Sequence, residues 1–144
     1  MRSQSRPYTL WALIGCLLFL SVSGLAGGIS MLLDPSGGIL SLPEDMLVNL
    51  PIDTFVLPGL YLVLVYGLLS PAIAYGLWRR SSWAWAASVI LSIILLGWII
   101  GQFILWGSPH IIQMVYFVLG FTMLILCLAP ATRVDQQTHV AMDY

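Results

Sequence analysis

Four long apolar stretches alternate with polar segments along the chain, over residues 9–33, 55–78, 83–106 and 111–129. None of the four contains Asp, Glu, Lys or Arg. About 20 predominantly apolar residues suffice for a helix to cross the ~30 Å hydrocarbon core of a bilayer. The pattern therefore predicts an all-α integral membrane protein, a four-helix bundle with each stretch as one spanning helix.

Two of the three links between these stretches are short. They are Arg-Arg-Ser-Ser at residues 79–82 and Gly-Ser-Pro-His at residues 107–110. Short links make the joined helices antiparallel neighbours. A serine of the first link is expected to cap the third helix, and Asp53 or Thr54 is expected to cap the second.

The remaining link, over residues 34–54, is much longer and has structure of its own. Residues 34–38 read Asp-Pro-Ser-Gly-Gly, a strong turn signal. Ser-Leu-Pro-Glu at residues 41–44 matches a capping box with proline in the first turn. We therefore expect a short helix from Leu42 to about Asn49, lying on the membrane surface.

Composition agrees with a membrane protein. Of the 144 residues 60% are hydrophobic and only 8% are charged, and the mean hydropathy is +0.97. A soluble domain has about 25% charged residues. The length fits one membrane domain over residues 1–144, and the net charge of −1 gives no electrostatic basis for binding nucleic acid.

The charges also predict an orientation. All basic residues fall on one side of a four-span topology: Arg2, Arg6, Arg79, Arg80 and Arg133. The long link on the other side carries Asp34, Glu44, Asp45 and Asp53. Arginine-rich short segments stay in the cytoplasm. Both termini, including the tail at residues 130–144, are therefore expected inside, with the loop at residues 34–54 outside.

Two glutamines are the most polar side chains in the predicted hydrocarbon. Trp98, Gln102 and Trp106 share one helix face, while His110 and Gln113 follow across the short turn. One interpretation is structural: Gln102 and Gln113 lie at similar depths and bond to each other across the hairpin. The other is a ligand-binding lining that these five residues give to a pocket in the outer leaflet.

Glycine pairs at GxxxG spacing occur at Gly24 and Gly28 and at Gly97 and Gly101. Small residues at this spacing let helix backbones approach closely. The pairs therefore predict packing surfaces, within the chain or between copies, and no chemistry.

A proline interrupts the second predicted span. Pro71 removes one backbone donor and frees the carbonyl of Gly67. We expect a packed kink in which Ser70 bonds to the backbone, in preference to a kink that borders a cavity.

Residues suited to catalysis or metal binding are few. His110 and His139 are predicted on opposite sides of the membrane, so they cannot share a metal. Cys16 and Cys127 are not in a CxxC arrangement. We expect no catalytic residue, no metal and no cofactor, and hence no enzyme.

Several short motifs resemble a family of uncharacterised small bacterial membrane proteins, frequent in actinobacteria. They are Gly-Gly-Ile-Ser-Met-Leu-Leu-Asp-Pro-Ser-Gly at 27–37, Leu-Pro-Gly at 57–59, Arg-Arg-Ser-Ser-Trp-Ala-Trp at 79–85 and Trp-Ile-Ile-Gly-Gln at 98–102. The resemblance extends to about residue 129. It implies four spans and a bacterial plasma membrane, and it implies no activity.

These observations favour a non-enzymatic subunit, scaffold or partner-binding protein. Its partners would be the lipid bilayer and a second copy or another membrane protein. The alternative is binding or transport of a small apolar molecule or lipid through the outer-leaflet pocket. Proton-coupled transport generally uses an intramembrane carboxylate, which the four stretches lack.

Overall fold

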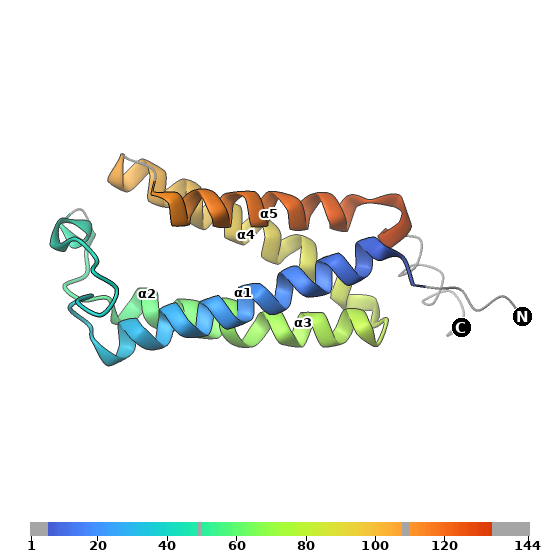
Figure 1. The fold of residues 1–144 in the computed structure, drawn as a ribbon, viewed down its shortest axis with the longest axis horizontal. Coiled ribbons are helices and arrows are strands. Elements are labelled where there is room, and N and C mark those ends of the chain that lie inside the picture. The colour runs from blue at the N-terminus through green and yellow to red at the C-terminus, as the bar shows by residue number, and fades with distance from the viewer. Residues whose placement is uncertain (1–5, 49, 108–109, 134–144) are drawn as a thin grey trace, which may run out of the picture. The chain divides into compact units, whose positions relative to one another are not determined.

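The computed structural model describes residues 6–48, 50–107 and 110–133. Four helical segments in it are long and apolar enough to cross a membrane (Figure 1): Tyr8–Leu33 (α1), Val56–Trp78, Ser82–Trp106 (α4) and Ile111–Leu128 (α5). The described residues form no strand. The predicted all-α class, with four helices long and apolar enough to span a membrane, is thus confirmed.

The second span is not one regular α-helix. It consists of α2 (Val56–Tyr61), a π-helix η2 (Leu62–Leu68) and α3 (Leu69–Trp78). Two contacts between Tyr61, the last residue of α2, and Tyr66 of η2 agree with the wider turn of a π-helix. The rings of Tyr61 and Tyr66 lie 5.4 Å apart, edge to face, and their hydroxyl oxygens are 3.0 Å apart. Side chains five residues apart meet because η2 repeats at i to i+5.

The proline of this span has the predicted effect on Gly67 and a different effect on Ser70. Pro71 has no N–H for the carbonyl of Gly67, and the hydroxyl of Ser21 donates to that carbonyl at 2.8 Å. The prediction for Ser70 is wrong, because its buried Oγ has no hydrogen-bond partner among the described residues. A helical serine bonds to the carbonyl three or four residues back, and the one three back is that of Gly67.

The chain forms two compact units. We call residues 18–72 the loop unit, and residues 1–17 with 73–144 the terminal unit. Helix α1 contributes its first turns to the terminal unit and the rest to the loop unit. Each unit is described by itself.

In the loop unit, α1 packs against α2 and η2 through glycines. A Cβ on Gly28 would lie 2.6 Å from the carbonyl oxygen of Gly59 and 2.6 Å from Cγ2 of Val63. A Cβ on Gly24 would lie 2.8 Å from Cβ of Tyr66. These distances are shorter than real side chains allow, so the first GxxxG pair packs helix against helix within the chain, as one of its two predicted uses.

The long loop begins with the predicted turn, which one carboxylate organises. Asp34 accepts hydrogen bonds from the backbone N–H of Ser36 at 3.2 Å, from the Ser36 hydroxyl, and from the N–H of Ile39 at 3.0 Å. These bonds, that of the Ser36 hydroxyl first, hold the pKa of Asp34 below its ordinary value of 3.8. The far end of the loop returns to the same turn, since Phe55 N–H donates to the carbonyl of Pro35 at 3.0 Å.

The short helix in this loop is smaller than predicted and begins later. It is a four-residue 3₁₀ helix, η1 (Glu44–Leu47), whose N-cap is Pro43. The predicted capping box at Ser41 is wrong, because Ser41 has a left-handed backbone (φ 52°) and closes a turn onto the carbonyl of Gly38. Asn49, the predicted end, lies outside the described residues.

The caps of the spanning helices also differ from prediction. The N-cap of α2 is Phe55, so neither Asp53 nor Thr54 caps it. Ser81 does occupy the N-cap of α4, although its side chain makes no capping hydrogen bond. The backbone N–H groups of both N-cap residues are bonded elsewhere, that of Phe55 to the carbonyl of Pro35 and that of Ser81 to the carbonyl of Gly76.

A Schellman turn joins α3 to α4 in the terminal unit. The N–H of Ser81 bonds to the carbonyl of Gly76 at 2.8 Å, and that of Arg80 bonds to Leu77 at 3.1 Å. Arg80 takes the left-handed position with φ 57°, where glycine is usual. The predicted short link is therefore a helix-ending motif built on an arginine.

Helices α4 and α5 form the predicted antiparallel hairpin, visible in Figure 1. The rings of Phe103 and Phe117 are 6.2 Å apart, and a Cβ on Gly120 would lie 3.2 Å from Leu96. By contrast, a Cβ on Gly97 or Gly101 would meet no described atom within 4 Å. For this second pair, packing between copies stays a prediction.

We expect Gly28→Ala to destabilise the protein by about 1–3 kcal/mol, since the new methyl group has no room between the backbones. Unfolding in detergent micelles, followed by circular dichroism, measures the change. Gly97→Ala is the matched control, with open space at its Cβ. It should be neutral or stabilising by up to about 1 kcal/mol. Equal effects at the two positions would contradict the packing described.

Candidate functional site

The candidate site lies where the hairpin turns from α4 into α5. His110 is the N-cap of α5, and Gln113 is the third residue of that helix. The side-chain Oε1 of Gln113 accepts the backbone N–H of His110 at 3.1 Å, which makes these two residues a capping box. Ser108 and Pro109 of the predicted turn lie outside the described residues.

The predicted glutamine pair is confirmed. Gln113 Nε2 donates to Gln102 Oε1 at 3.2 Å. Gln113 is buried, with 6% of its surface exposed, and Gln102 is half-buried. A continuous chain of bonds thus runs from the backbone of His110 through the amide of Gln113 to α4.

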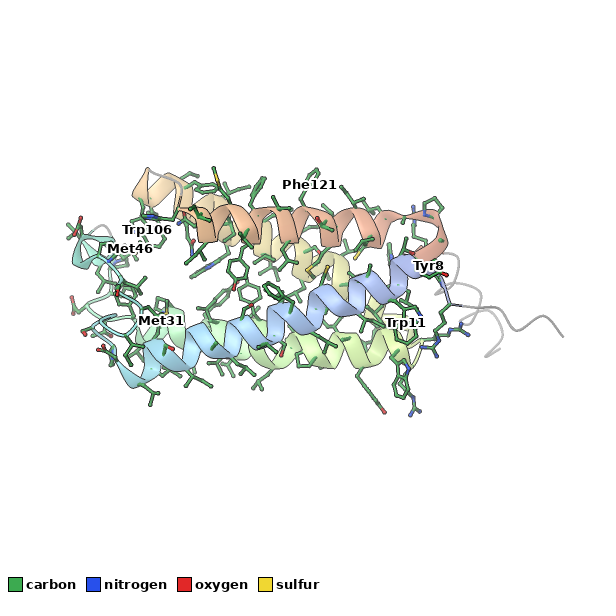
Figure 2. The ribbon with its side chains drawn as sticks, viewed as in Figure 1. Tyr8, Trp11, Met31, Met46, Trp106 and Phe121 are labelled. Atoms are coloured by element: carbon green, nitrogen blue, oxygen red, sulfur yellow. The ribbon has the colours of Figure 1, made fainter. Side chains whose placement is uncertain are left out.

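The other two predicted site residues flank this chain on α4. Trp98 lies one turn before Gln102 and Trp106 one turn after it, and both are half-buried. Figure 2 shows Trp106 at the end of α4 next to the turn. The exposed His110 contributes its backbone N–H. Hydrogen bonds therefore bring together three of the five residues, and helical spacing aligns the tryptophans with them.

The chemistry available at this site is that of neutral amides and indoles. A carboxamide does not titrate near neutral pH, and it donates and accepts hydrogen bonds. Among the described residues, no group of three His, Cys, Asp or Glu side chains is placed to hold a metal ion. The arrangement clamps α4 to α5 at one end of the hairpin.

Sequence reasoning missed how the opposite end of the terminal unit is tied together. Arg6 donates to the carbonyl of Trp78 at 2.7 Å, and the hydroxyls of Thr9 and Thr132 are 2.7 Å apart. These bonds join the start of α1 to the end of α3 and to the residues after α5.

A third bond joins the start of α4 to the end of α5 at this same end. The indole N–H of Trp85 donates to the carbonyl of Cys127 at 2.8 Å. A helix leaves its last four carbonyls unpaired. That rule identifies Trp78 and Cys127 as acceptors from sequence, but it does not identify their donors.

Comparisons with protein-family models, with curated proteins and with solved structures each find no match for this chain.

We expect the glutamine pair to appear as an energetic coupling. In a double-mutant cycle of Gln102→Leu and Gln113→Leu, the coupling should be about 0.6–1.7 kcal/mol. Gln113→Leu alone should cost more than Gln102→Leu, because it also removes the cap on the His110 N–H. Unfolding in detergent micelles provides all four stabilities.

The control cycle pairs Gln102→Leu with Met114→Leu. Met114 is exposed and adjoins Gln113 in sequence. These two changes should add within ~0.3–0.5 kcal/mol. Additivity in the glutamine cycle as well would show that the 3.2 Å contact contributes nothing.

Proposed function

We propose that the chain is a non-enzymatic component of a bacterial plasma membrane, acting as a subunit, scaffold or partner-binding protein. The observation that carries this proposal is the use of polar groups inside the spans. Gln102 bonds to Gln113, and Ser21 bonds to the carbonyl of Gly67. Ser88 and Ser92 donate to carbonyls of their own helix at 2.8 Å. These bonds hold the fold, which supports a structural task for the polar groups.

The carboxylate of Asp34, at the start of the long loop, supports the same proposal. An enzyme at a membrane needs a base, a nucleophile or a metal near the surface. Asp34 is engaged by Ser36 and Ile39, which stabilise its ionised form and make it a weak base. Its place in the turn gives it a structural task.

The alternative function, binding of a small apolar molecule or lipid in the outer leaflet, would use the glutamine amides. The Oε1 of Gln113 accepts a hydrogen bond from His110, and its Nε2 donates one to Gln102. A ligand that takes these groups would have to replace both bonds. The loss of these two hydrogen bonds on ligand binding favours the proposed non-enzymatic role over the alternative.

The proposed orientation puts both termini in the cytoplasm. Four arginines of the described chain lie in the terminal unit, at helix ends joined by the bonds of Arg6, Thr9 and Trp85. Three described Asp residues, Asp34, Asp45 and Asp53, lie in the long loop. Arginines confined to the links on one side of a four-span topology are what the positive-inside rule associates with the cytoplasm.

Cysteine labelling tests the orientation. In a chain with Cys16 and Cys127 replaced, we expect Thr54→Cys to react with an impermeant maleimide on intact cells. Ser82→Cys should react only after lysis. Both positions are exposed and lie in different links. Labelling of both from one side would contradict the four-span topology, and exchange of the two results would reverse the orientation.

Copurification tests the function. After extraction from membranes of the native host in a polymer that keeps the surrounding lipid, we expect a defined membrane protein, or a second copy, at fixed stoichiometry. Mass spectrometry of proteins and small molecules identifies what is bound. A stoichiometric small molecule without a protein partner would overturn the proposal in favour of the alternative.

Two matched variants then locate the contact. Gly97→Leu with Gly101→Leu changes an open face of α4, and Gly15→Leu changes an open position on α1. Neither variant displaces a described atom within 4 Å of the new Cβ. Loss of the partner from the first variant alone would assign the contact to α4.

A further inference from the structure

The end of the terminal unit that carries the arginines has no internal counter-charge in the described chain. We call it the arginine end. The described residues of this unit, 6–17, 73–107 and 110–133, contain four arginines and neither Asp nor Glu. Arg2, Asp135 and Asp143 lie outside the described residues. Arg6, Arg79 and Arg133 thus have no carboxylate among the described residues of their own unit.

Three of these guanidinium groups lie over aromatic rings. The distances from Cζ to the ring centroid are 5.6–5.9 Å for Arg6 over Trp11, Arg79 over Tyr75 and Arg133 over Trp85. A ring face attracts a cation and orients it without using its N–H groups. Each guanidinium is therefore held in place while it keeps donors for a ligand.

The donors already in use can be counted for two of these residues. Arg6 gives a bond to the carbonyl of Trp78 at 2.7 Å, and Arg79 gives one to the hydroxyl of Tyr75 at 3.2 Å. A guanidinium has five N–H donors. Arg79 and Arg133 are both exposed, so their remaining donors reach the surroundings of the protein.

Exposed aromatic side chains surround the arginines. Tyr8 is 93% exposed, and Trp11, Trp78 and Trp83 are each about half exposed. Figure 2 shows Tyr8 and Trp11 at the start of α1. Tyrosine and tryptophan favour the level of the lipid headgroups, where one end of the ring is apolar and the other is hydrated. We therefore expect the arginine end at the depth of lipid phosphates.

We propose that the arginine end binds the headgroups of anionic phospholipids, with Arg79 and Arg133 each donating to phosphate oxygens. The planar donors of arginine match phosphate in a bidentate manner. A zwitterionic headgroup would bring its own ammonium toward these cations, whereas an anionic one brings a net negative charge. The inference rests on the proposed function only in that the chain spans a bilayer.

Lipid competition in a bilayer tests it. The full chain is reconstituted in nanodiscs with equal amounts of phosphatidylglycerol and phosphatidylcholine, and native mass spectrometry counts the lipids that stay bound. The wild type should retain phosphatidylglycerol preferentially. Each arginine near a surface contributes about a fivefold preference. Arg79→Gln with Arg133→Gln should therefore lower the preference roughly 25-fold.

Two further variants separate charge, geometry and folding. Arg79→Lys with Arg133→Lys keeps both charges without the planar donors. It should therefore lose less of the lipid preference than the two Arg→Gln changes together. Asp45→Asn with Asp53→Asn changes two charges in the other unit and should leave the preference unchanged. Arg6 stays unchanged in all of them, because it also bonds to the carbonyl of Trp78.

Three results would overturn the inference. The variant with Arg79→Gln and Arg133→Gln could keep the wild-type preference. The variant with Asp45→Asn and Asp53→Asn could lose as much of the preference as that variant does. The wild type could keep its preference when salt rises from about 0.05 to about 0.5 M. The salt series needs no variant, so it tests the inference even if the variant with both Arg→Gln changes does not fold. Nanodiscs expose both faces, so a reversed orientation in the labelling experiment leaves this result independent.

Discussion

A backbone carbonyl inside the hydrocarbon has no water to bond to, so each one that a helix releases needs a donor within the protein. Pro71 releases the carbonyl of Gly67, and Ser21 supplies the donor at 2.8 Å. That bond requires α1 to approach the second span closely, which Gly24 and Gly28 permit. The donor from Ser21 and the close packing at the glycines thus occur together beside one missing N–H.

The same constraint orders the helix ends of the terminal unit. Arg6 bonds to the last residue of α3, Trp85 bonds to the carbonyl of Cys127, and Gln113 caps the start of α5. These three polar side chains thus form hydrogen bonds with backbone groups at helix ends. What remains for function is the outside of the helices, which is where both a membrane partner and a lipid headgroup would bind.

Sequence alone predicted the features that depend on length, and it failed where hydrogen-bond register depends on a distant residue. The turn between α4 and α5 fixes depth along the hairpin, so the pairing of Gln102 with Gln113 followed from counting residues. The unpaired hydroxyl of Ser70 did not follow, since the carbonyl of Gly67 accepts from Ser21, 46 residues away. Nothing in the local pattern predicted the π-helix. Ser41 failed for a local reason, because a left-handed turn took the position expected for a cap.

The two GxxxG pairs show why a packing motif cannot be interpreted from one helix. Gly24 and Gly28 face a second span that has its own glycines, at Gly59 and Gly67, so both backbones come together. Gly97 and Gly101 have the same spacing, yet no described atom lies within 4 Å of their Cβ positions. The glycine of α5, Gly120, faces leucines of α4 instead. Close approach needs small residues on both sides, so a helix that packed closely on Gly97 and Gly101 would have to bring small residues of its own.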